Sequence, residues 1–218
     1  MSTETNRDLA RDQAFAMTAA AAIVAGQGWI MMDLHVAGRW LVSSATIVLL
    51  IVIAATYLMR RRQWRIRRAI EIGLAALLVI IDVVNLLALG QQAFFLDKPT
   101  AALELLFTGA ILWVMNVLIF AIFYWLLDAG GPDLRASGQP KQPDFVFPQQ
   151  TDPQNAQADW GPGFGDYLYL AFTGATSFGP TDAMPYTRRA KAAMAIEGGL
   201  ALITLGVIIA RAVSLATD

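Results

Sequence analysis

The sequence predicts an all-α membrane protein with about five transmembrane helices and one short re-entrant helix between the last two. Two observations lead to this fold class. Of the 218 residues, 56% are hydrophobic and only 15% are charged, whereas a soluble domain carries about 25% charged residues. The charges are also clustered, which leaves apolar stretches as long as the roughly 20 residues that a helix needs to cross a bilayer.

Five stretches are apolar enough to be spans: residues 14–32, 41–59, 69–89, 102–127 and 192–213. The first is the weakest, because it is rich in alanine and interrupted by Gly26 and Gly28. The fourth ends in Phe123, Tyr124 and Trp125, an arrangement typical of the aromatic belt at a membrane interface. The N-terminal residues mix acids and bases without an apolar run that leads to a cleavage site. We therefore expect no cleaved signal peptide.

A polar segment, residues 128–160, follows the fourth stretch. It contains five of the nine prolines and is typical of an irregular extramembrane loop. Residues 163–176 come next and are apolar and aromatic, but they are too short to cross a bilayer. Irregular backbone at membrane depth persists only where it is buried in protein or lines water. This segment is therefore predicted to be a re-entrant helix.

The end of the chain has a particular order of elements. After the short aromatic helix come the turn Thr176-Ser-Phe-Gly-Pro-Thr-Asp182, the segment Met184-Pro-Tyr-Thr187, and a helix with Glu197, Gly198, Gly199 and Gly206. This order resembles the pore module of the potassium-channel superfamily, in which a pore helix leads to a T-x-G-Y-G-D filter and then to an inner helix with a glycine hinge. The resemblance covers roughly the last quarter of the chain.

The resemblance implies an ion pathway along the turn. The residues at filter positions are Ser177, Phe178, Gly179, Pro180, Thr181 and Asp182, preceded by Thr176. A potassium filter needs unusual dihedrals, which glycine permits, but only Gly179 remains. Thr181 resists positive φ, and Pro180 fixes φ and removes an N–H. We expect a wider, hydrated pathway that is lined by hydroxyl groups and a ring of Asp182 carboxylates, which favours cations.

Two interpretations stay open for several of these residues. The turn at 177–182 also suits a simple interhelical loop, because Ser, Thr and Asp side chains bond nearby backbone. Glu197 either pairs with the short helix or lines the pathway. Gly198, Gly199 and Gly206 allow close helix packing or form a gating hinge.

Three polar residues lie inside the predicted spans, namely Asp82, Asn85 and Asn116. A carboxylate in hydrocarbon costs several kcal/mol, so we expect Asp82 to face the interior of the bundle. It is either a proton or cation relay, or a hydrogen-bonded residue that holds helices together.

Basic residues predict which end of each span is cytoplasmic. By counting spans, 13 basic residues fall on one side and 3 on the other. The larger group is Arg7, Arg11, Arg60, Arg61, Arg62, Arg65, Arg67, Arg68, Arg135, Lys141, Arg188, Arg189 and Lys191. This bias predicts a filter-like loop that faces the cytoplasm, inverted relative to potassium channels, unless the third or fourth stretch does not span.

A second likeness is to bacterial membrane proteins with a channel-like C-terminus, which share the run FYWLLDAGGP at 123–132 and the run DFVFPQ at 144–149. Together the resemblances imply an N-terminal three-helix membrane region, residues 1–100, and a pore-like module, residues 101–218. The module would comprise an outer helix, the loop 128–160, the re-entrant helix and filter-like loop 163–182, and the inner helix 192–213. They also imply a multi-pass protein of the bacterial inner membrane.

The predicted function is passive conduction of cations, monovalent ones included, by a homo-oligomer. One loop per chain cannot enclose an axis, so oligomerisation is part of the prediction, and a tetramer is favoured. The alternative is a non-conducting scaffold or accessory subunit with the same fold. The sequence contains no nucleophile elbow, phosphate-binding glycine loop, His-rich metal motif or nucleic-acid signature. We therefore expect no enzyme activity, no cofactor, no metal site and no nucleic-acid partner.

Overall fold

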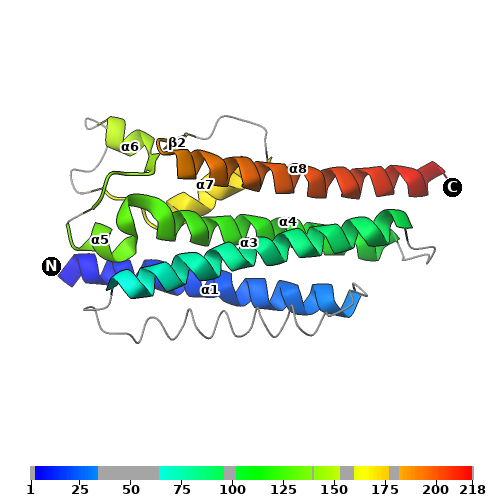
Figure 1. The fold of residues 1–218 in the computed structure, drawn as a ribbon, viewed down its shortest axis with the longest axis horizontal. Coiled ribbons are helices and arrows are strands. Elements are labelled where there is room, and N and C mark those ends of the chain that lie inside the picture. Colours follow the sequence, from blue (N-terminus) through cyan, green and yellow to red (C-terminus); the bar gives the residue numbers. More distant parts are fainter. Residues whose placement is uncertain are drawn as a thin grey trace.

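The computed structural model describes residues 3–33, 64–95, 102–138, 140–152, 160–176 and 182–217. Four long helices lie side by side along one axis (Figure 1). They are α1 (Thr3–Asp33), α3 (Trp64–Phe95), α4 (Ala102–Leu127) and α8 (Arg188–Thr217). A shorter helix, α7 (Phe164–Thr176), packs against α4 and α8. The predicted span 41–59 lies outside the described residues.

Three of the described helices are long and apolar enough to cross a membrane: Arg68–Phe94, Leu103–Gly130 and Arg188–Val213. They coincide with the predicted spans at 69–89, 102–127 and 192–213, and they indicate an integral membrane protein whose apolar helices contact the bilayer. The helix α1 is not among the three, in keeping with the weak apolar signal of residues 14–32. The all-α class is confirmed, whereas the number of five spans stays a prediction.

The centre of the bundle is α4, which contacts α1, α3, α7 and α8. Within its most apolar window 61% of the residues are buried, against 22% for α8. The predicted aromatic belt at its end is wrong for two residues, because Tyr124 and Trp125 are only 0% and 1% exposed. Their rings pack against Phe145 and Phe164. These aromatic side chains are therefore core residues rather than lipid-facing anchors.

The chain turns sharply after α4. The 3-10 turn η2 (Asp128–Gly130) contains Ala129 at φ 50° and Gly130 at φ 95°, and Gly131 follows at φ 94°. A side chain on Gly130 would also meet Leu134, since an added Cβ would lie 2.6 Å from its Cδ1. Glycine at these two positions relieves the strain of the left-handed conformation, so the sequence Asp-Ala-Gly-Gly ends the helix here.

The segment predicted to be an irregular loop is folded in its described part. It forms the short helices α5 (Pro132–Ala136) and α6 (Pro148–Thr151), and the strand β1 (Phe145–Val146). The prolines favour the two short helices, because Pro132 and Pro148 stand at the helix starts, where their fixed φ suits the first turn. The strand β1 pairs antiparallel with β2 (Met184–Pro185).

These short elements lie together at one end of the bundle, which we call the capped end (Figure 1, left). The helices α1, α3, α7 and α8 begin there, and α4 ends there. The described basic residues at the capped end are Arg7, Arg11, Arg65, Arg67, Arg68, Arg135, Lys141, Arg188, Arg189 and Lys191, whereas Arg211 lies toward the opposite end. Within the described ranges the basic residues are thus segregated as the span count predicts, and the cytoplasmic location of this end stays a prediction.

Candidate functional site

The start of α7 is fixed at the capped end. The backbone N–H of Gly163 donates to Asp166 Oδ2 at 2.8 Å, and the N–H of Phe164 donates to the carboxylate of Asp12 on α1. A carboxylate is favoured at a helix N-terminus, because the unpaired N–H groups carry partial positive charge. Burial raises the pKa of Asp12, and its hydrogen bond to Phe164 opposes that rise. The helix α1 thus helps to position the short helix.

From this end α7 runs alongside α4 and stops partway along the bundle (Figure 1). Its 13 residues span about 20 Å, whereas a bilayer core is about 30 Å thick. The described chain resumes at Asp182 and enters β2, where Pro185 pairs with Phe145 of β1 at the capped end. The chain therefore goes into the bundle and comes back at the same end.

Only the two ends of the predicted filter are among the described residues. Thr176 closes α7, and its hydroxyl donates to the carbonyl of Thr173 at 3.0 Å. Asp182 is exposed and lines a small cavity of about 70 Å³, together with Asp166, Tyr169 and Thr173. Residues Ser177, Phe178, Gly179, Pro180 and Thr181 lie outside the described part. Two acidic residues thus line the same cavity where the chain returns to the capped end.

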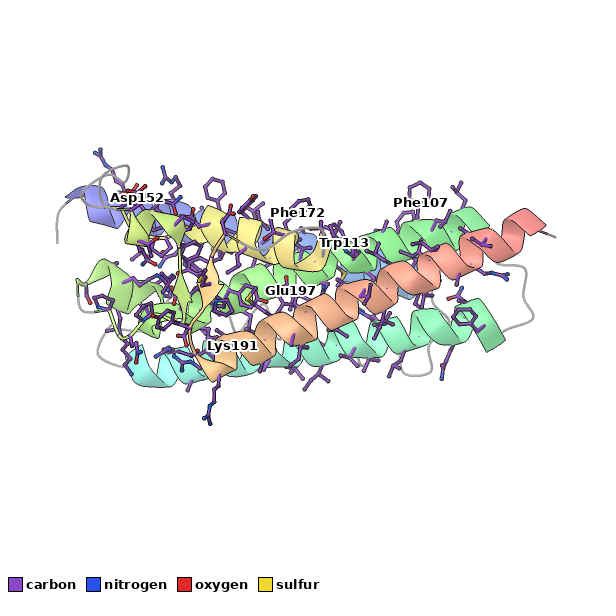
Figure 2. The ribbon with its side chains drawn as sticks, turned by 90° about the horizontal axis from the view of Figure 1, so that it is seen from above. Phe107, Trp113, Asp152, Phe172, Lys191 and Glu197 are labelled. Carbon is purple, nitrogen blue, oxygen red and sulfur yellow. The ribbon has the colours of Figure 1, made fainter. Side chains whose placement is uncertain are left out.

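Glu197 is fully buried beside the end of α7. The hydroxyl of Tyr124 donates to Glu197 Oε2, and Asn116 Nδ2 donates to the Glu197 carbonyl at 3.4 Å. A Cβ on Gly174 would lie 2.8 Å from Glu197 Oε2. Figure 2 shows Glu197 in the interior, next to α4. The hydrogen bonds of Glu197 thus go to α4, while the backbone of α7 passes close to its carboxyl group at Gly174. Neither pairing with the short helix nor a place along the pathway is decided by these contacts, and both stay predictions.

The glycines of α8 fall into two groups. A Cβ on Gly198 would lie 3.7 Å from the carbonyl oxygen of Gly174, whereas no atom of the described residues lies within 4 Å of such an atom on Gly199 or Gly206. Gly198 therefore faces α7 at ordinary contact distance, where a methyl group would also fit, and the choice between close packing and a gating hinge stays open for the three glycines. Gly109, which the sequence did not suggest, is the glycine that close packing requires, since a Cβ there would lie 2.5 Å from Ile208 Cγ1 of α8.

Replacing Gly174 with alanine is expected to destabilise the fold by about 1–3 kcal/mol, because overpacking forces neighbours to shift. The added methyl group would press on the Glu197 carboxyl, which Tyr124 holds in place. Gly165→Ala in the same helix is the matched control, since nothing lies within 4 Å of its Cβ position. The measurement is reversible unfolding in mixed micelles. Equal stability of the two variants would contradict the close contact.

Asp128 organises the capped end, although the sequence did not single it out. Its Oδ1 accepts from the backbone N–H groups of Asp144 at 2.6 Å and Phe145 at 3.1 Å. Its Oδ2 accepts from the Tyr167 hydroxyl at 2.6 Å. Burial raises the pKa of Tyr167 well above its usual value, so the hydroxyl stays protonated and donates. One buried carboxylate thus joins the end of α4, the strand β1 and α7.

A second buried carboxylate, Asp144, joins the capped end to the start of α8 by hydrogen bonds. Arg189 Nε donates to Oδ1 at 2.6 Å, and Arg189 Nη2 donates to Oδ2 at 2.7 Å. The Thr187 hydroxyl also donates to Oδ1, at 2.6 Å, and it caps α8 by accepting from the Ala190 N–H. In the sequence, these two acids stand out only because they belong to the runs at 123–132 and 144–149 on which the second likeness rests.

The polar residues inside the spans are buried, as expected. Asn85 and Gln27 of α1 exchange two hydrogen bonds, of 2.7 and 3.4 Å, so Asn85 joins two helices. Asp82 and Asn116 are 2% and 1% exposed. Each carries a buried oxygen that accepts no hydrogen bond from the residues that the structure describes.

No family model, curated protein or solved structure matches the chain. Within the part of the chain that the structure describes, no group of three or more His, Cys, Asp or Glu side chains is placed to hold a metal ion. Chemically, the described site offers carboxylates, hydroxyls and the C-terminal carbonyls of α7. The carboxylates and carbonyls can only accept hydrogen bonds, whereas the hydroxyls can also donate, so the set as a whole suits a cation better than an anion.

Proposed function

We propose that the protein is a channel-like membrane protein that conducts cations passively through an oligomeric pore with a filter not of the potassium type. The observation that carries this proposal is the path of α7. It begins at the capped end, stops partway along the bundle, and its chain returns to the same end. A polar turn at that depth must be buried in protein or line water. A re-entrant helix between the fourth and fifth of five spans meets this requirement.

The charge around this path favours cations. The C-terminus of α7 carries partial negative charge from the helix dipole, and it ends inside the bundle. Asp166 and Asp182 line one cavity at the mouth, where acidic side chains raise the local concentration of cations. The pathway would follow Thr176, Ser177, Phe178, Gly179, Pro180, Thr181 and Asp182, and monovalent cations would pass it partly hydrated.

The pore requires several copies of the chain. One loop cannot enclose an axis, and a tetramer of pore-like modules, residues 101–218, is the favoured assembly. The low burial of α8 supports this, since only 22% of its apolar window is covered within one protomer. The region 1–100 would pack outside. The clustering of basic residues favours a cytoplasmic capped end in a bacterial inner membrane, which makes the filter inverted.

The test is cation flux into liposomes that contain the purified protein, after its mass in detergent has been measured. We expect a tetramer whose flux falls several-fold in Asp182→Asn. Asp8→Asn is the matched control, because Asp8 is exposed and lies near the start of α1, at the same end of the bundle. It should retain native flux. A monomer would contradict the pore, and a tetramer without flux would support the scaffold alternative.

A further inference from the structure

Two basic side chains stand on one face of α8 where this helix begins at the capped end. They are Arg188 and Lys191, which lie three residues apart. Residues at this spacing are neighbours on the surface of a helix, so their charges act together. Both residues are exposed, and Figure 2 shows Lys191 at the start of the helix. We call these two residues the basic pair of α8.

The basic pair forms no ion pair with an acid in the ranges that the structure describes. The carboxylate of Asp144, at the same end of α8, is occupied by Arg189, which donates to both of its oxygens. Arg68 of α3 adds positive charge nearby, since its guanidinium is close enough to that of Arg189 for the two to repel each other. The charge of the basic pair is therefore available to an anion outside the protein.

The depth of the basic pair matches the headgroup layer of a bilayer. The apolar helix Arg188–Val213 has 26 residues and is about 39 Å long, whereas the hydrocarbon core is about 30 Å thick. Its first turn therefore extends into the layer that holds the lipid phosphates. Tyr186, two residues before Arg188, is exposed, and tyrosine is favoured at this interface.

The face of α8 that carries Lys191 is apolar farther along the helix. Leu202 follows Lys191 by eleven residues, or about three turns and 16 Å, so it lies on the same face. Its side chain is exposed. This distance is close to the depth of one leaflet, which is about half of the core. One face of α8 thus presents charge at headgroup depth and apolar surface below it, as the two parts of a phospholipid require.

Another exposed face of α8 remains for contacts between copies of the chain. Ile196 and Ile203 are exposed, and their positions lie about a third of a turn around the helix from Lys191. A lipid on the first face therefore leaves room for a second protomer on the other.

We propose that Arg188 and Lys191 bind the phosphate of an anionic phospholipid whose acyl chains cover the same face of α8 as far as Leu202. A zwitterionic lipid brings its own cation, so two unpaired basic side chains favour a headgroup with net negative charge. Free phosphate offers the same oxygens, but it leaves the apolar surface below the pair uncovered. The site lies on the outside of the single chain and does not depend on cation conduction.

The test is the amount of lipid that the purified full-length chain retains in neutral detergent, measured by native mass spectrometry. The chain is titrated with phosphatidylglycerol and, separately, with phosphatidylcholine, and we expect several-fold greater retention of phosphatidylglycerol. Excess inorganic phosphate should not displace the lipid. Equal retention of the two lipids would overturn the proposal, and displacement by phosphate would replace the lipid site with a free-anion site. This comparison uses the native chain alone and does not depend on the folding of a variant.

The double variant Arg188→Gln with Lys191→Gln should retain several-fold less phosphatidylglycerol, because both side chains that attract the headgroup are neutral. Arg7→Gln with Arg11→Gln is the matched control, since it removes the same charge from exposed residues of α1 at the capped end. The control should retain the native amount. Equal losses in the two double variants would mean attraction by net charge alone and would overturn the site. In neutral detergent without anionic lipid, both should unfold at the native midpoint, because all four side chains are exposed.

Discussion

Replacing Asp128 with alanine is expected to lower the free energy of unfolding by roughly 3–5 kcal/mol, because each buried donor left without a partner costs about 1–3 kcal/mol. Three donors lose their acceptor, namely the N–H groups of Asp144 and Phe145 and the hydroxyl of Tyr167. The loss is large because Asp128 is only 1% exposed, so water cannot replace the carboxylate without opening the capped end.

The measurement is reversible unfolding in mixed micelles, followed by tryptophan fluorescence, to which the buried Trp125 contributes. Asp128→Asn keeps one acceptor oxygen and should lose about half as much stability. Asp8→Ala removes an exposed carboxylate and should stay within about 0.5 kcal/mol of the native chain. An Asp128→Ala variant as stable as that control would contradict the role of Asp128 at the capped end.

Replacing Arg189 with methionine is expected to destabilise the protein by roughly 2–4 kcal/mol, because it leaves a buried carboxylate without its cation. The Asp144 side chain is 0% exposed, whereas that of Arg189 is 53% exposed. This exposure places the expected loss below that of a fully buried pair. The Thr187 hydroxyl would remain as the only side-chain donor to Asp144 among the bonds described above.

Arg188→Met is the matched control, since Arg188 is the exposed neighbour at the start of the same helix. It should change stability by less than about 0.5 kcal/mol. The double variant Asp144→Asn with Arg189→Met removes both charges, so its loss should be smaller than the sum of the single losses. Additive losses would mean that the two side chains do not act as a pair.

The long helices could be predicted from the sequence because lipid imposes a simple requirement on apolar length. The predicted span at 102–127 has the same bounds as α4, and the predicted span at 69–89 lies within the longer helix α3, Trp64–Phe95. The short helix predicted at 163–176 begins one residue later, at Phe164. Apolar length does not reveal which face of a helix packs against other helices. The sequence therefore predicts a membrane interface for the aromatic residues at the end of α4, although two of them are buried in the core.

The polar contacts could not be predicted, since each joins residues far apart in the sequence. The bond between Tyr124 and Glu197 spans 73 positions, and that between Asp144 and Arg189 spans 45. Neither residue type nor spacing reveals such a register. Tyrosine and tryptophan suit a lipid interface as well as a buried core with one hydrogen bond, so the aromatic run at Tyr124 and Trp125 fits both environments. The contact of Asp12 could not be predicted for the same reason, because its partner is the backbone N–H of Phe164, far along the chain at the start of α7.

The most direct test of the proposed pathway is chemical block of cation flux at Thr176. The chain has no cysteine, so Thr176→Cys introduces a single thiol at the end of α7. A membrane-impermeant thiol reagent should abolish flux in this variant and leave Asp8→Cys, labelled at the exposed capped end, fully active. Undiminished flux through completely labelled Thr176→Cys would contradict conduction along the turn that follows α7.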